Sequence, residues 1–262
     1  MVTALLLAGK RDGKQDPLAF EESVSHKCLV SVAGRPMILH VLHALASAPA
    51  VEKIVISIDD PTALASLPEL HELEASGRLT VVTAHENLVE SIFAAAETAQ
   101  FPMLVTTADN VLLTPDALAE FKAGVAEARA DAAVAFTMRQ SVLAAHPDGQ
   151  RRFYKFSDGS YSNCNMYWIG NRQSLQAAEV FRSGGQFAKH PSRIISAFGL
   201  INLLRFRLGL ASLSGAFRRF SSRLGMAISP VILSDGAVAI DVDNPRTLSV
   251  AESILHARRE AR

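Results

Sequence analysis

Short apolar segments alternate with segments of helical periodicity over the first half of the chain, and this alternation limits the folds open to it more than any other feature. Five apolar runs are too short for helices and rich in aliphatic residues, which predicts buried strands. They lie at residues 2–7, 51–58, 79–83, 103–107 and 132–138. We expect helices between them at residues 37–48, 61–76, 88–98 and 115–128. Such alternation predicts an α/β fold of three layers, with a largely parallel sheet and helices on both faces.

The second half of the chain departs from this pattern. Residues 153–169 are aromatic and polar, and Asp158-Gly159 predicts a hairpin turn between two strands. Beyond Arg172 the chain is mainly helical to about Leu224. Two late strands are expected at 231–233 and 237–240, before a final helix that starts at Pro245. We therefore expect one domain over residues 1–262, with a hairpin at 153–170 and a basic helical insertion at 172–228.

Charge and cysteine content exclude several classes of protein. The 262 residues carry 26 basic and 26 acidic side chains, so general nucleic-acid binding is not expected. Cys28 and Cys164 form neither a disulfide framework nor a metal-ligand pattern, which indicates a reducing, cytoplasmic compartment. The N-terminus lacks the layout of a signal peptide, and no apolar run is long enough to span a membrane.

The loop after the first strand is rich in glycine and positive charge. It contains Gly9, Lys10, Arg11, Gly13 and Lys14. Glycine lets backbone N–H groups approach an anion closely, and the cationic side chains neutralise it. Two interpretations remain open at this point, a phosphate-binding loop and a solvated basic turn.

Carboxylates follow two of the expected strands. Asp109 comes after the strand at 103–107, and Asp241 and Asp243 end the one expected at 237–240. Ligands of open α/β sheets gather at the carboxyl ends of strands, and carboxylate oxygens suit Mg²⁺. Asp243 has a second interpretation, because an Asp just before Asn244-Pro245 is also typical of a helix cap.

Four motifs in the same order resemble the MobA-like and sugar-phosphate nucleotidyltransferases. They are LLLAG at 5–9, HKCLVSVAGRPMILHVL at 26–42, TTADN at 106–110 and VDNPRTL at 242–248. The segment from Asn87 to Ser91 is similar to the part of that family that reads the base. The chain has Lys10 where the family has its second glycine, so Lys14 competes with Arg11 for the role of the family's arginine.

The resemblance implies a Rossmann-like nucleotidyltransferase fold, which is related to the GT-A fold. It also implies a Mg²⁺-dependent reaction that transfers a nucleoside monophosphate from an NTP, CTP or GTP, to a small phosphorylated acceptor and releases pyrophosphate. It implies catalytic roles for Arg11, Lys27 and Asp109, and Mg²⁺ bound by Asp109 and Asp243. The nucleotide-binding residues that it implies are Leu7, Ala8, Gly9, Lys10, Gly13, Lys14, Asn87, Ser91, Thr107 and Ala108. Two alternatives stay open, a GT-A-type glycosyltransferase that uses a nucleotide-sugar and a non-catalytic regulatory protein.

The acceptor is expected at the hairpin, where the family usually builds its acceptor pocket. Lys155 would meet the acceptor phosphate, and Asn163 or Asn165 its hydroxyl groups. The competing interpretation is an ordinary hairpin whose aromatic side chains pack on the sheet.

Residues 180–234 contain no acidic residue and eight basic ones. A basic amphipathic segment, here 189–223, is able to contact an anionic membrane surface, which would place the protein near a membrane. The alternative is a helical cover whose apolar face is core and whose arginines are solvated.

Overall fold

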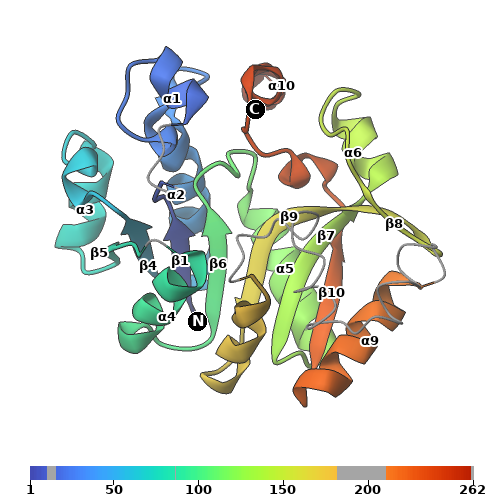
Figure 1. Ribbon diagram of the computed structural model, residues 1–262. Coiled ribbons are helices and arrows are strands. Elements are labelled where there is room, and N and C mark those ends of the chain that lie inside the picture. Colours follow the sequence, from blue (N-terminus) through green and yellow to red (C-terminus); the bar gives the residue numbers. More distant parts are fainter. Residues whose placement is uncertain (11–15, 86, 182–210, 261–262) are drawn as a thin grey trace.

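The structure, a computed structural model, is built around a mixed sheet and describes residues 1–10, 16–85, 87–181 and 211–260 (Figure 1). The eight strands of the sheet within these residues follow the order β10-β7-β9-β6-β1-β4-β5, and β8 pairs with β9. Their bounds are β1 Val2–Leu7, β4 Val51–Ile58, β5 Leu79–Thr83, β6 Met103–Thr107, β7 Ala132–Met138, β8 Tyr154–Phe156, β9 Gly159–Ile169 and β10 Ile228–Leu233. A separate two-stranded ribbon pairs β2 Ser31–Val32 with β3 Arg35–Pro36.

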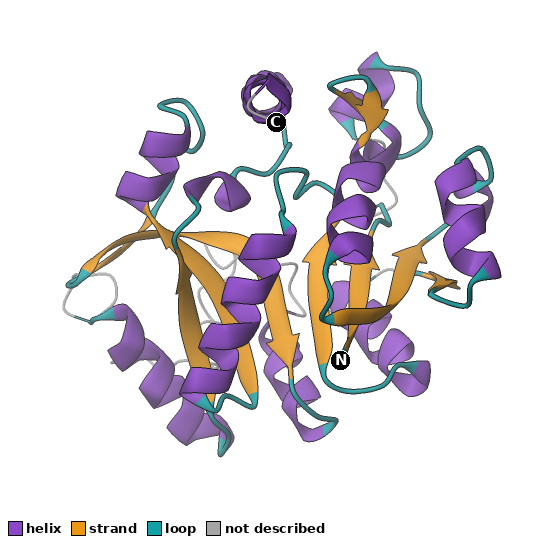
Figure 2. Ribbon diagram, turned by 180° about the vertical axis from the view of Figure 1, so that it is seen from behind, coloured by secondary structure: helices purple, strands orange, loops and turns teal. Residues whose placement is uncertain are grey.

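Helical segments connect and cover the strands (Figure 2). The α-helices are α1 Pro17–Glu21, α2 Met37–Ser47, α3 Pro68–Ala75, α4 Leu88–Thr98, α5 Pro115–Ala128, α6 Arg139–Ala145, α9 Leu213–Leu224 and α10 Pro245–Glu260. The 3₁₀ segments are η1 Lys27–Leu29, η2 Pro61–Leu64, η3 Gln173–Phe181 and η5 Gly236–Ala239.

β9 is what makes the sheet mixed. It lies between β6 and β7 and runs antiparallel to both. The other neighbouring strands along the order of the sheet are parallel: β1 with β4 and β6, β4 with β5, and β7 with β10. The predicted hairpin at 153–170 is therefore β8 and β9, with β9 inserted into the middle of the sheet. The carboxyl ends of β1 and β6 remain side by side, with Leu7 opposite Thr107.

The two faces of the sheet carry separate cores, which follows from the alternation of side chains along a strand. Ala4 and Leu6 of β1 pack with α2 and α5, whereas Leu5 packs with α4 and η3. On the latter face, Phe217 of α9 meets Phe136 of β7 edge to face, with ring centroids 5.8 Å apart. The three-layer α/β/α arrangement predicted from the sequence is confirmed.

Several local predictions were wrong. Residues 236–239 form the buried 3₁₀ turn η5 and not a strand, because Asp235 caps the turn by accepting from the N–H of Ala237. The helix expected over 61–76 breaks into η2 and α3, since Pro68 holds Leu67 in an extended conformation. The helices α1 and α6 were not predicted.

Part of the basic segment is described. In α9 the apolar residues Phe217, Phe220 and Leu224 pack on the protein, and Arg218 and Arg223 are exposed, as a helical cover requires. The remainder of the proposed membrane-contacting segment, 189–210, lies outside the described residues. Among the helices that the structure describes, none has the length and apolar character to cross a bilayer.

A substitution at Phe121 of α5 tests the packing of the core that supports β6 and β7, because the side chain of Phe121 is fully buried. Phe121→Ala is expected to lower the free energy of unfolding by about 3 to 5 kcal/mol, since it removes a ring and leaves a cavity. Urea denaturation measures this loss. Lys122→Ala, an exposed change in the same helix, is the control and should stay within about 0.5 kcal/mol of the native protein. Equal losses in both variants would contradict the packing described.

Candidate active site

The ammonium group of Lys27 lies between two carboxylates at the carboxyl end of the sheet. Its Nζ atom donates to Asp109 Oδ2 and to Asp243 Oδ1, each at 2.7 Å. The three residues come from η1, from the loop after β6 and from the loop before α10. The structure thus brings together three residues that the sequence motifs had singled out.

Backbone and side-chain hydrogen bonds hold the two carboxylates in place. Thr107, the last residue of β6, donates from Oγ1 to Asp109 Oδ1 at 2.5 Å. The N–H of Val242 donates to the carbonyl oxygen of Asp109 at 3.1 Å, which ties the loop before α10 to the end of β6. Asn244 caps α10 by accepting from the N–H of Thr247. Asp243 is therefore not the capping side chain, and its carboxylate is directed to Lys27.

The two carboxylates fix the charge state of Lys27. Burial by itself would lower the pKa of the ammonium group, but attraction to Asp109 and Asp243, together with their hydrogen bonds, raises it well above its ordinary value. Lys27 therefore remains charged at any physiological pH. A permanent positive charge at this position suits stabilisation of negative charge on a phosphate.

Asp241 is a third carboxylate beside this pair, and the sequence analysis gave it no role of its own. Asn165 of β9 donates a hydrogen bond to it, but its Oδ1 atom is buried and has no hydrogen-bond partner among the residues that the structure describes. Burial, followed by repulsion from Asp109 and Asp243, raises the pKa of Asp241 well above its ordinary value. The carboxyl group therefore holds its proton to higher pH than an exposed aspartate.

The arrangement fits a hard divalent cation. Asp109 Oδ2 and Asp243 Oδ1 both reach one cationic atom, so both are able to reach one metal ion. Within the described residues no cluster of three or more His, Cys, Asp and Glu side chains forms a metal site. Mg²⁺ commonly takes one or two carboxylates and completes its coordination with water and substrate phosphates, so two converging carboxylates suffice.

The start of the glycine-rich loop is fastened by Asp59, which follows β4. Asp59 Oδ1 accepts from the N–H of Lys10 at 2.9 Å, and Oδ2 meets Nε2 of the buried His26 at 3.2 Å. One carboxylate thus holds the loop and the residue before Lys27 together. Sequence reasoning missed this network, and the only signal for Asp59 was its place at a strand end.

Backbone donors of the loop are partly used inside the protein. The N–H of Ala8 donates to the carbonyl oxygen of Ser57, and that of Lys10 to Asp59. A methyl group on Gly9 would lie 3.1 Å from Ala84 Cβ, so the close approach of the loop after β5 favours glycine there. Arg11, Gly13 and Lys14 lie outside the described residues.

The residues expected to read the base organise the loop before α4. Asn87 caps this helix, with Oδ1 accepting from the N–H of Val89 at 2.9 Å. The hydroxyl of the buried Ser91 accepts from the N–H of His85, also at 2.9 Å. Both side chains therefore shape this loop, and contact with a base remains a prediction.

Of the predicted acceptor residues, Asn165 lies beside the carboxyl group of Asp241. Asn163 donates to the hydroxyl of Tyr167 at 2.6 Å, and Asn165 has a left-handed backbone, with φ at 48°. This conformation accompanies an irregularity in the pairing of β9 with β7, and it brings Asn165 to Asp241. Lys155 lies on the exposed strand β8.

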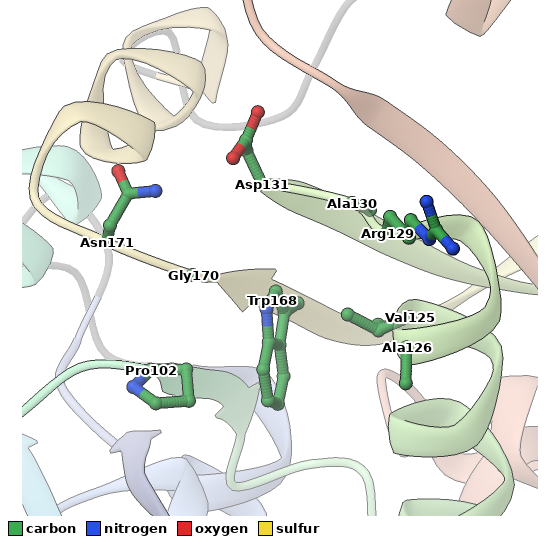
Figure 3. Close-up of a pocket in the computed structure, with 9 residues that line it drawn as sticks. All are labelled: Pro102, Val125, Ala126, Arg129, Ala130, Asp131, Trp168, Gly170 and Asn171. Atoms are coloured by element: carbon green, nitrogen blue, oxygen red, sulfur yellow. The ribbon is translucent and has the colours of Figure 1, made fainter.

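Two cavities lie at different edges of the sheet. One, of about 320 Å³, is lined by Trp168, Arg129, Asp131 and neighbours, where β6 and β7 begin (Figure 3). The other, of about 620 Å³, includes Asp243 and three arginines. Only the second adjoins Lys27, so we place the candidate active site there and not at the cavity of Figure 3.

Comparisons with known proteins identify the family and the fold of the chain. A family model described as the MobA-like NTP transferase domain matches residues 20–188. A hypothetical transferase structure from Thermus thermophilus aligns over 94% of this chain and 99% of its own, with a TM-score of 0.76 and 23% identity.

Two further structures are similar. CMP:2-keto-3-deoxy-manno-octonic acid synthetase complexed with CTP has a TM-score of 0.58 and 14% identity, over 98% of this chain and all (100%) of its own. 4-Diphosphocytidyl-2C-methyl-D-erythritol synthase from Anaerococcus prevotii has a TM-score of 0.56 and 10% identity, and the alignment covers 97% of this chain and 96% of its own. At these identities the structural likeness establishes a shared fold alone. No curated protein sequence matches the chain significantly.

Asp241 yields a prediction on stability. A carboxyl group whose pKa is raised on folding binds more protons in the folded state than in the unfolded state, so stability falls as pH rises above the unfolded pKa of about 4. Asp241→Asn keeps an acceptor for Asn165 and removes the ionisation. In metal-free buffer at pH 7.5 the variant should be about 1 to 3 kcal/mol more stable than the native protein, with the difference vanishing near pH 4.

Chemical denaturation at several pH values measures this difference. Asp116→Asn, at an exposed position in the first turn of α5, is the control, and we expect it to be slightly destabilising at pH 7.5 because it removes a charge that the helix N-terminus favours. A variant of Asp241 that is less stable than the native protein at pH 7.5 would contradict the raised pKa.

Proposed function

The chain belongs to the MobA-like NTP transferase domain family, and from this premise we propose that it is a Mg²⁺-dependent nucleotidyltransferase. It transfers a nucleoside monophosphate from CTP or GTP to a small phosphorylated acceptor. Pyrophosphate is the second product. The observation that carries the proposal is the convergence of Lys27, Asp109 and Asp243 beside the loop that follows β1.

The reaction needs charge stabilisation and positioning more than covalent chemistry. An oxygen of the acceptor phosphate forms a bond to the α-phosphorus of the NTP. The bond from the α-phosphorus to the bridging oxygen breaks, and pyrophosphate leaves with its electron pair. Lys27, which is always charged, offsets negative charge on the phosphates, and Asp59 keeps Lys10 and His26 in place around it.

Asp109 and Asp243 are the proposed ligands of Mg²⁺, which when bound supplies charge neutralisation for the phosphates. The two carboxylates pair with Lys27. A cation bound between them would leave the ammonium group of Lys27 available to the phosphates. Arg11 and Lys14 are proposed to add positive charge from the loop.

The choice of CTP or GTP rests on analogy. One structural neighbour was solved with CTP and another is named for a diphosphocytidyl product. In this chain we propose that Asn87 and Ser91 lie at the base, and that Asn163, Asn165 and Lys155 contribute to the acceptor side. A glycosyltransferase that uses a nucleotide-sugar would release a nucleotide and no pyrophosphate, so one assay separates the two functions.

Pyrophosphate release tests the proposal. The purified protein is incubated with Mg²⁺, each of the four NTPs and a panel of sugar, alditol and inositol phosphates. At least one pair should release pyrophosphate, and chelation of Mg²⁺ should stop it. Lys27→Met and Asp109→Asn should each lower kcat about 100-fold or more, because each removes charge stabilisation at the phosphates.

Asp116→Asn serves again as the matched control, because this exposed aspartate of α5 forms none of the ion pairs of Lys27 in the described residues, and its loss should leave kcat unchanged. The proposal fails if no NTP yields pyrophosphate with any acceptor and Asp109→Asn leaves nucleotide binding unaltered.

A further inference from the structure

A cavity of about 620 Å³ adjoins the candidate active site, and each residue that lines it has a polar or charged side chain. The lining residues are Gln150, Arg151, Arg152, Asp243, Asn244 and Arg246. Asp243 belongs to both places, because its carboxylate lines this cavity and accepts from Lys27. A molecule in the cavity is therefore next to the proposed point of reaction.

The turn that carries two of the arginines has a defined structure. Gln150 Oε1 accepts from the backbone N–H of Arg151 at 3.0 Å and from that of Arg152 at 3.5 Å. Gly149 is buried, and a methyl group there would come within 2.5 Å of Ile240 Cδ1, so the turn packs closely on the chain that leads to Asp241. Arg246 donates to the carbonyl oxygen of Asp148, which joins the turn to the start of α10.

The positive charge of the cavity is not balanced by ion pairs within the part of the chain that the structure describes. Across residues 1–10, 16–85, 87–181 and 211–260, no salt bridge joins a carboxylate to Arg151, Arg152 or Arg246. Asp243 is the one acidic residue of the lining, and it is paired with Lys27. Guanidinium groups bind carboxylates and phosphates through paired, charge-assisted hydrogen bonds, so three of them around one cavity indicate an anionic ligand.

The position of the cavity separates it from the triphosphate. The loop after β1 leads into α1, whereas the turn at 146–152 follows α6. Both views place α1 and α6 on opposite sides of α10, at the same end of the sheet (Figures 1 and 2). The turn that carries Arg151 and Arg152 therefore follows the helix on one side of α10, and the helix that the loop after β1 leads to lies on the other side.

We propose that the acceptor carries a second anionic group, a phosphate or a carboxylate, which Arg151, Arg152 and Arg246 bind while the reacting phosphate lies at Lys27. This inference rests on the proposed function, and it narrows the acceptor to compounds with two separated anionic groups. The arginines act on the choice of acceptor and its orientation, and they take no part in the bond exchange.

Matched pairs of acceptors test the inference by calorimetric binding. One pair is fructose 6-phosphate and fructose 1,6-bisphosphate, which differ by a phosphate. The other is glycerol 3-phosphate and 3-phosphoglycerate, which differ by a carboxylate. Binding is measured with Mg²⁺ and a methylene analogue of CTP, and again with the GTP analogue, so that no turnover occurs.

The native protein should bind the doubly substituted member of at least one pair about tenfold more tightly, because charge-assisted hydrogen bonds to the second group are added. Arg151→Gln/Arg152→Gln should abolish this preference and leave binding of the monophosphates within about twofold. Arg129→Gln, at an exposed position on the opposite edge of the sheet, should keep it. The pair in which the doubly substituted acceptor binds more tightly shows whether the second anionic group is a phosphate or a carboxylate.

Equal affinities within both pairs, or a preference that survives in the double variant, would overturn the inference. Pyrophosphate release measured on the same preparations separates this failure from that of the proposed function. If pyrophosphate is released but the preference is absent, only the second anionic group is excluded. If no acceptor gives pyrophosphate, the proposed function fails whatever the arginines bind.

Discussion

The ion pairs of Lys27 with Asp109 and Asp243 are the interaction on which the rest of the site depends. They join residues 82 and 216 positions apart in the sequence, so they form only when the whole sheet is assembled. Lys27 and Asp109 are partly buried, whereas Asp243 is exposed, and burial of the first two charges costs solvation free energy that attraction offsets only when the geometry is good. The hydrogen bonds of Thr107 and Val242 around Asp109 provide that geometry. Stability and the proposed function thus depend on the same contacts.

The sheet explains why these groups meet. β1 and β6 are parallel neighbours, so the loops that follow them lie side by side. β9 is antiparallel to β6, and Asn165, in the middle of β9, has a left-handed backbone conformation. The chain before α10 then crosses the same edge and adds Asp241 and Asp243. An irregular strand, a buried carboxyl group without a full set of partners and an unbalanced cluster of arginines all lie at this edge. Such departures from ordinary packing are typical of sites that are completed by a ligand.

Sequence reasoning predicted much of this arrangement. Period and length of the apolar runs gave β1, β4, β5, β6 and β7, and the motifs selected Lys27, Asp109 and Asp243 before their contacts were known. The buried run at 236–239 was mistaken for a strand because a continuous apolar run does not distinguish a strand from a buried turn. Asp59 and the arginines of the cavity were missed as site residues because their importance comes from tertiary contacts, which leave no local pattern.

A crystal structure with CTP or GTP and Mg²⁺ tests the central claim most directly. The account predicts a metal ion bound by Asp109 and Asp243 at about 2.0 to 2.1 Å, the triphosphate over Gly9 and Lys10, and the ammonium group of Lys27 turned from the carboxylates to a phosphate oxygen. A nucleotide bound at the opposite edge of the sheet, near Trp168 and Arg129, with Lys27 still paired to both carboxylates, would contradict it.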